Sequence, residues 1–158
     1  MQTLAAPPPT LSRADAVRFL QRATFGPSPD DVTWLMANGI DAWFADQWQR
    51  TNPSTMQQRR RSFSHTGRAI WSGILGGHDQ HRKRMGYTLS QIFVASSRGL
   101  PKGKIEPYID LLDEHAFGTY RNLIERITLS NAMADFLTYT HNKKADPEQG
   151  SLPDENYA

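Results

Sequence analysis

The chain has 158 residues, which is room for one ordinary domain, and its 38% hydrophobic and 22% charged residues are typical of a globular protein. The formal net charge of +2 is too small to indicate a nucleic-acid or membrane partner by itself. Cysteine is absent from the sequence, which excludes disulfides, zinc–thiolate sites and thiol nucleophiles. The sequence lacks a signal-peptide pattern and a membrane-spanning apolar stretch, so we expect a soluble chain, and its compartment stays open.

The first helix is predicted directly after a proline-rich lead-in. Residues 1–11 include three successive prolines, and we expect them to form a flexible segment outside the fold. Ser12 can cap a helix by accepting a hydrogen bond from a backbone N–H of the first turn, where Asp15 adds a favourable negative charge. Apolar residues at helical spacing then predict a helix to about Ala23.

Two more helices are predicted before residue 53. Ser28 and Pro29 combine a capping hydroxyl with a proline at the first helical position, and Gly39 supplies the matching end. Asp41 can cap the next helix, which ends before Pro53. The aromatic face of that helix consists of Trp43, Phe44 and Trp48. Aromatic residues at this spacing are mostly core, so we interpret them as core and not as a ligand-stacking surface.

Further helices are predicted in the rest of the chain. The pattern predicts a helix around Trp71, a longer central one from about Asp79 to Ala95, and three shorter ones at about 107–115, 119–127 and 130–139. The central helix has an apolar stripe that includes Phe93, which we expect in the core together with Trp43. With no alternating strand pattern, the sequence predicts an all-α, irregular bundle of about seven to nine short helices over residues 12–140.

Histidines and basic residues gather between residues 59 and 84. His65, His78 and His81 with Asp79 could be taken for a metal site, but the positive charges nearby would oppose a cation. We therefore predict no metal and interpret the segment around residue 79 as a solvated helix start. The arginines could also contact phosphates of single-stranded nucleic acid. Charged helix faces are usually only solvated, so a nucleic-acid partner is not expected.

Residues 141–158 form a long polar segment that holds most of the candidate site residues. Its carboxylates and amides could bind a hard cation or transfer a proton, although we favour the interpretation as an irregular surface connection whose polar residues satisfy the loop backbone. The catalytic candidates are Glu155, Asp154 and His141, and the ligand-binding candidates are Arg22, Arg121, Asn142 and Asn156. The segment 153–155 also resembles a helix start, and too few residues follow it to form a stable helix, so we expect the chain to be truncated there.

Several separated motifs resemble, in the same order, the N-terminal part of the bacterial family called domain of unknown function 1800. The motifs are FLQRATFGP at 19–27, LSQIF at 89–93, HAFG and YRNL within 115–123, NKKADP at 142–147 and PDENYA at 153–158. The resemblance implies a longer intact protein in which the last motif continues into an amphipathic helix with further acidic residues. It implies no activity, and it implies that relatives are often exported.

Two functions stay open from the sequence. The first is a binding or assembly module within a larger protein, which we consider because no complete catalytic constellation is present. Its partner would be an unidentified protein or ligand. The sequence does not indicate a cofactor. The alternative is the N-terminal part of an enzyme whose active centre combines the 141–158 segment with a downstream helix. We expect residues from Asp146 onward to be poorly ordered without such a packing partner.

Overall fold

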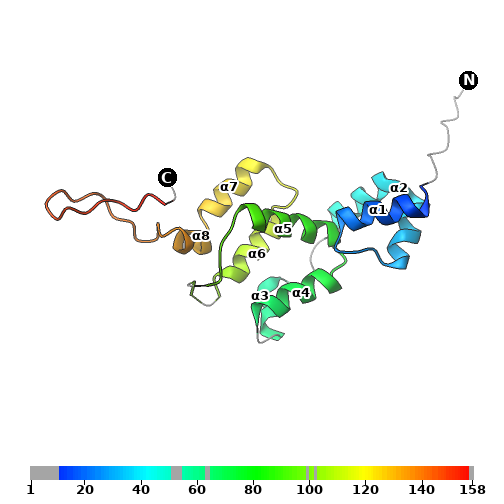
Figure 1. Ribbon diagram of the computed structural model, residues 1–158, viewed down its shortest axis with the longest axis horizontal. Coiled ribbons are helices and arrows are strands. Elements are labelled where there is room, and N and C mark those ends of the chain that lie inside the picture. Colours follow the sequence, from blue (N-terminus) through cyan, green and yellow to red (C-terminus); the bar gives the residue numbers. More distant parts are fainter. Residues whose placement is uncertain (1–10, 51–54, 63–64, 99, 102, 157–158) are drawn as a thin grey trace, which may run out of the picture.

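The computed structural model describes residues 11–50, 55–62, 65–98, 100–101 and 103–156 (Figure 1). Eight helices lie in these residues: α1 (Arg13–Ala23), α2 (Pro29–Gln49), α3 (Met56–Ser62), α4 (Thr66–Gly76), α5 (Gln80–Ile92), α6 (Ile105–Glu114), α7 (Tyr120–Thr128) and α8 (Asn131–Phe136). Within the same residues the only β pairing is an isolated antiparallel bridge between Asp146 and Ser151. The prediction of an all-α fold is confirmed. The predicted lead-in lies outside the described residues except for Leu11.

Hydroxyl caps fix the start of four helices. The hydroxyls of Ser12, Ser28, Thr119 and Ser130 each accept a hydrogen bond from a backbone N–H in the first turn of α1, α2, α7 and α8. At α2 the cap is reciprocal, because the Asp31 carboxylate also accepts from the backbone N–H of Ser28 at 3.0 Å. Such caps satisfy N–H groups that have no partner inside the helix. These helix starts agree with the sequence prediction.

Helix α3 and the ends of α5 and α8 differ from the predictions, whereas the break at Gly39 does not. The second and third predicted helices are the two halves of α2, and the predicted break between them is confirmed, because Gly39 adopts a non-helical φ of 85° and ψ of 170°. Helix α3 has no counterpart among the predicted helices, because its sequence MQQRRRS shows no apolar periodicity. Helices α5 and α8 end at Ile92 and Phe136, earlier than the predicted ends near residues 95 and 139.

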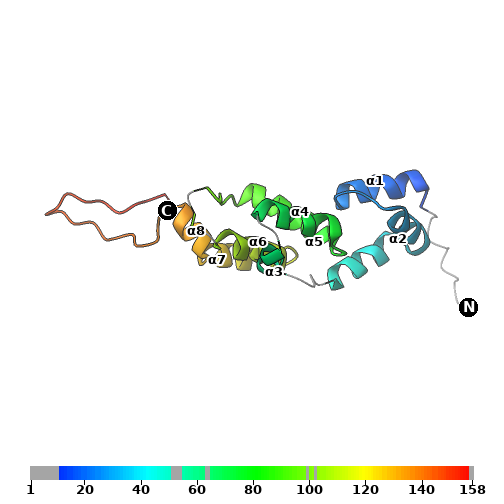
Figure 2. The same cartoon turned by 90° about the horizontal axis from the view of Figure 1, so that it is seen from below.

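The helices surround two separate hydrophobic clusters. One lies between α1 and α2 and centres on Leu20, Leu35 and Trp43, and the other joins α6, α7 and α8 around Leu112 and Ile127. Helix α5 packs against α1 and α2 on one side and α6 on the other, so it connects the two clusters. Figures 1 and 2 show the resulting elongated molecule, with α1 and α2 at one end and residues 141–156 extending from the other.

The predicted aromatic core is confirmed for Trp43 and in part for Phe44, which packs against the same cluster. Trp43 is buried, whereas Phe44 is half-buried and Trp48 is 58% exposed, so the prediction for Trp48 is wrong. Helix α1 covers one face of α2, and Trp48 lies near the end of α2, beyond the buried cluster. Phe93 is partly buried and packs against the second cluster. No helix in the described part of the chain is long and apolar enough to span a bilayer.

Candidate functional site

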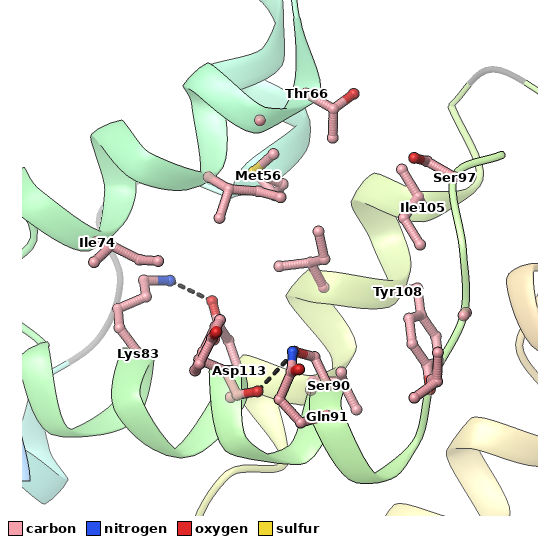
Figure 3. A pocket seen from close by; sticks show the side chains of 18 of the residues that line it. Met56, Thr66, Ile74, Lys83, Ser90, Gln91, Ser97, Ile105, Tyr108 and Asp113 are labelled. Carbon is pink, nitrogen blue, oxygen red and sulfur yellow. Dashed lines mark hydrogen bonds and ion pairs between the residues drawn. The ribbon is translucent and has the colours of Figure 1, made fainter. Parts of the chain in front are cut away.

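A groove lies between α3, α4, α5 and α6, and it encloses a cavity of about 530 Å³. Three helices line it along matching lengths: residues 66–74 of α4, 83–91 of α5 and 105–113 of α6 (Figure 3). On α5 the lining residues are spaced by three and four, which is the spacing of one helix face. Each of the three helices therefore presents a lengthwise stripe to the same space. We call this space the groove.

The walls of the groove are mainly apolar. Ile70 and Ile74 of α4 line the cavity together with Ile105 and Leu112 of α6. Tyr87 and Val94, on the α5 side, also line the groove, yet they are 43% and 52% exposed. Apolar side chains that line a concavity and remain in contact with water mark a surface on which another group can pack.

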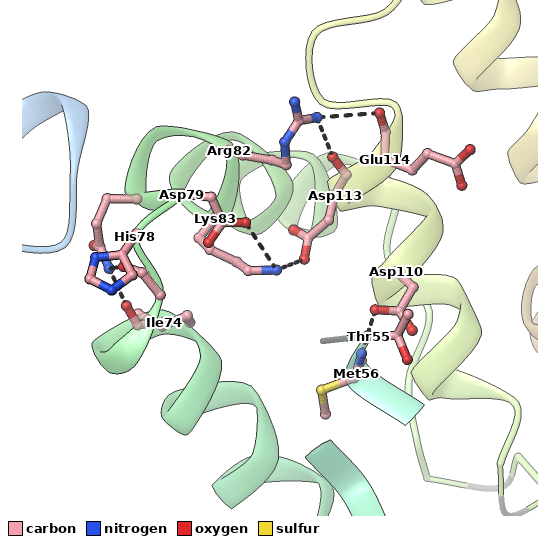
Figure 4. A network of polar contacts seen from close by, with 12 residues as sticks. Thr55, Met56, Ile74, His78, Asp79, Arg82, Lys83, Asp110, Asp113 and Glu114 are labelled. Atoms are coloured by element: carbon pink, nitrogen blue, oxygen red, sulfur yellow. Dashed lines mark hydrogen bonds and ion pairs between the residues drawn. The ribbon is translucent and has the colours of Figure 1, made fainter. Parts of the chain in front are cut away.

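A buried ion cluster closes one end of the groove. The Lys83 ammonium donates a hydrogen bond to the Asp113 carboxylate and lies 3.7 Å from a carboxylate oxygen of Asp79 (Figure 4). Lys83 and Asp79 are 4% and 1% exposed. Burial raises the pKa of Asp113 above its usual value, the nearby Lys83 opposes this, and the negative charge of Asp79 adds to it.

This cluster corrects the sequence interpretation of a solvated helix start around residue 79. Asp79 and Lys83 are one helical turn apart, so both side chains lie on the face of α5 that meets α6. His81 is also packed, with its ring 5.2 to 5.4 Å from the rings of Trp43, Phe44 and Phe117. The interpretation as a solvated helix start is wrong because neighbouring basic residues of a helix point in different directions, and the sequence alone does not show which of them points into the protein.

Gly86 allows the carboxylate of Asp113 to approach α5. A Cβ atom built at Gly86 would lie 2.1 Å from an Asp113 carboxylate oxygen, which is far too close. Arg82 adds a second link, because its guanidinium donates to the backbone carbonyl of Asp113 at 3.1 Å. Together these contacts hold α5 and α6 at a fixed spacing at the closed end of the groove. A glycine three residues after Lys83 is the one sequence signal for this close approach.

Comparison with known protein families identifies the family of this chain. Residues 18–158, nearly the whole chain, match the family described as protein of unknown function DUF1800. The chain belongs to the DUF1800 family. This confirms the resemblance seen in the separated motifs. No curated protein and no solved structure shows a significant match to the chain.

In this DUF1800 chain the residues proposed from the sequence fall into two groups. Asn142, Asp154 and Asn156 lie together in residues 141–156, which we call the arm. Arg22, on α1, is exposed at the opposite end of the molecule from the arm (Figure 2). Arg121 is exposed on α7, and none of the contacts among described residues joins it to the arm. The structure therefore does not bring either arginine to Glu155.

The polar groups of the arm bond mainly to one another. The Asn142 side chain accepts from the backbone N–H of Asp154 at 2.8 Å and donates to its carbonyl. Hydrogen bonds from the Thr138 hydroxyl and from the backbone N–H of Asn156 lower the pKa of Asp154 below its usual value. The Asn156 amide donates to Thr138 at 3.1 Å.

The other two arm candidates stand apart from this network. Glu155 is exposed, and no contact within the described residues engages its carboxylate. His141 is exposed and adopts a left-handed backbone with φ 66°. The catalytic and binding roles of all these residues stay predictions. In the part of the chain that the structure describes, no group of three or more His, Asp or Glu side chains could hold a metal ion.

Proposed function

We propose that this DUF1800 chain is a binding module and that the groove is its binding site. The observation that carries the proposal is an apolar concavity that is lined by three helices and whose edge, at Tyr87 and Val94, stays exposed to water. Its volume of about 530 Å³ falls within the roughly 300 to 1,000 Å³ common for ligand sites. A few polar groups among apolar walls complete the usual chemistry of such a site.

Preorganisation also supports the groove as a site. Lys83 and Arg82 of α5 both bond to Asp113 of α6, so two of the walls are tied together before any ligand arrives. Because these walls are already ordered, binding has a lower entropy cost, and more of the contact energy between ligand and groove remains as affinity.

The arm is the weaker candidate for the site. Its carboxylate at Asp154 accepts hydrogen bonds from Thr138 and Asn156, and the side chain of Asn142 is bonded to the backbone of Asp154. Groups that are used in this way hold the shape of the arm, and a reacting centre would need them free to contact substrate. The enzyme alternative, with Glu155 as acid, base or ligand, stays a prediction.

Filling the groove tests the proposal. Gly67 lies in the wall of the groove on α4, is exposed, and has open space around the position of a Cβ. The substitution Gly67→Leu should therefore occupy the groove without a clash, and it should favour the helix by about 1 kcal/mol. Gly76→Leu is the matched control, because Gly76 lies on the same helix with open space but outside the groove.

The readout is the fluorescence of the apolar dye 1-anilinonaphthalene-8-sulfonate. We expect saturable dye binding to the unchanged chain and to Gly76→Leu, and a loss of at least about tenfold in affinity for Gly67→Leu, because the cavity volume is removed. Equal dye binding by both variants, or no saturable binding to the unchanged chain, would show that the groove is not the site.

A further inference from the structure

Acidic side chains gather on the face of α6 that meets its neighbours around the groove. Glu106, Asp110 and Asp113 are spaced four and three residues apart, so they share one helix face. Glu106 accepts a hydrogen bond from the Thr66 hydroxyl of α4 at 2.8 Å. Asp110 accepts from the backbone N–H of Met56, on α3, at 2.6 Å. The third carboxylate, that of Asp113, lines the groove itself at its closed end.

The basic side chains do not balance these acids. Among the described residues that line the groove, the cations are Lys83 and Arg59, and the Arg59 guanidinium packs closely against α4. Burial raises the pKa of Asp113, Lys83 opposes this shift, and the negative charges of Asp79 and Asp110 add to it. Even with Arg59 counted, the carboxylates described around the closed end outnumber the cations. The closed end therefore complements a positive charge on a ligand.

One oxygen of Asp113 is available to accept a hydrogen bond. Oδ2 accepts from Lys83, whereas no hydrogen bond within the described residues engages Oδ1. Oδ1 lies beside Gly86, which also lines the groove, because a Cβ built at Gly86 would be 2.1 Å from this oxygen. The Asp113 side chain is only 10% exposed, so little water replaces the absent donor. A carboxylate can accept several hydrogen bonds, so a donor on a ligand would complete this one.

The apolar walls lead away from this carboxylate along the helices. The lining stripes of α4, α5 and α6 each cover nine residues, which is about 12 Å at the rise of an α-helix. Figure 3 shows Lys83 and Asp113 toward one end of the groove and Thr66 and Ile105 toward the other. An alkyl chain of about eight carbons is about 9 Å long at the bond spacing of an extended chain, so it fits this length.

We infer that the groove binds a small amphiphile, a primary alkylamine, whose ammonium donates to Asp113 Oδ1 and whose apolar chain lies along α4 and α6 toward Ile105. This inference rests on the proposed function and names the class of ligand. Lys83 is bonded to the other oxygen, so one carboxylate holds both ammonium groups. A lysine side chain of a peptide has the same head group on a chain about half as long as the groove, so a small molecule fits better.

Three ligands with the same chain test the inference by isothermal titration calorimetry at neutral pH. They are octylammonium, octanol and octanoate, which differ only in the charge of the head group. We expect octylammonium to bind at least about tenfold more tightly than octanol, because a charge-assisted hydrogen bond is stronger than a neutral one. Octanoate should bind most weakly, because its carboxylate would meet the excess of negative charge.

Protein variants assign the preference to Asp113. Asp113→Asn removes the charge at nearly unchanged size, so the affinity for octylammonium should fall at least about tenfold while that for octanol stays the same. Asp135→Asn is the matched control, because Asp135 of α8 is also paired with a lysine, Lys104, and lies outside the groove. This control should leave both affinities unchanged.

A measurement on the unchanged chain keeps the test independent of how Asp113→Asn folds. In backbone amide NMR spectra, octylammonium should shift the signals of Gly86 and Asp113 more than octanol does, because only the ammonium approaches Oδ1. Equal shifts of these two signals by both ligands would contradict the assigned position of the head group.

The outcomes separate the alkylamine assignment from the proposed function. The dye requires only the apolar walls, because its sulfonate can remain in water at the exposed edge beside Tyr87 and Val94. If the dye binds in the groove but octylammonium does not bind, or binds no more tightly than octanol or octanoate, the alkylamine assignment is wrong while the groove stays a site. Unchanged affinity of octylammonium for Asp113→Asn would also overturn it. If neither the dye nor any of the three ligands binds, the proposed function itself is wrong.

Discussion

Lys83 lies between Arg82 and Arg84, which have the same charge and different surroundings. The guanidinium of Arg82 packs over the ring of Phe117, and that of Arg84 packs over Phe25. Of these three basic residues, only Lys83 is buried. Successive residues on a helix point about 100° apart, so a basic run in sequence becomes three separate contacts in space.

Removal of the buried ammonium is expected to be costly. In Lys83→Met the carboxylates of Asp113 and Asp79 lose their cation in a buried site. The loss of one partner from a buried pair typically costs about 3 to 5 kcal/mol, and we expect a free energy of unfolding lower by that amount in urea denaturation. The control Lys144→Met removes an exposed lysine of the arm and should change stability by less than about 0.5 kcal/mol.

A second variant keeps this prediction specific to the ion pair. Lys83→Met combined with Asp113→Leu replaces both charges by apolar groups, which is often neutral for buried pairs, so the double variant should recover much of the loss. The remaining Asp79 carboxylate limits the recovery. If Lys83→Met alone were as stable as the unchanged chain, the buried pairing would be absent in solution.

These residues also show what can and cannot be predicted from sequence at this scale. Lys83 and Asp113 lie thirty positions apart and come from different helices, so no local pattern joins them. The polar network of Asn142, Asp154 and Asn156 is easier to predict, because these residues share one short segment of unusual polarity. That cluster can be predicted because its residues are close in sequence, although its hydrogen bonds stabilise the arm itself.

At the scale of elements, capping chemistry predicts helix starts better than periodicity predicts buried faces. Ser12, Ser28, Thr119 and Ser130 all cap the helices expected of them. On α5, by contrast, the apolar stripe predicts a core face, yet Ile92 at its end is 64% exposed. Periodicity shows which side chains share a face, and it does not show whether a partner covers that face.

The capping box of α2 gives a prediction for an element. Ser28→Ala removes the hydroxyl that accepts from the backbone N–H of Asp31 at 3.1 Å. The N–H would lose its acceptor, and stability should fall by about 0.5 to 2 kcal/mol, with α2 affected first. Hydrogen exchange across residues 29–35 and thermal unfolding would measure both effects. Ser28→Thr, which keeps the hydroxyl as acceptor from Asp31 N–H and as donor to the Asp31 carboxylate, should recover most of the loss, and an equal loss in both variants would contradict the capping role.

At the scale of the whole molecule, α5 connects the two hydrophobic clusters. It packs on α1 and α2 and on α6, and one of its faces borders the groove. A binding partner seated in the groove would therefore contact the element that links both halves. This arrangement could not be predicted from the sequence, because the order of helices along the chain does not determine which of them leave a space between them.

Deletion of the arm decides between the groove and the arm as the functional part. The groove is lined by α3 to α6 and the segment after α5, so a chain without residues 141–158 should keep its helical circular dichroism and bind 1-anilinonaphthalene-8-sulfonate with unchanged affinity. The arm is exposed along most of its length, and the hydrogen bonds of Asn142 and Asp154 described above remain within residues 138–156. Loss of dye binding on deletion would contradict the groove as the site and favour the arm.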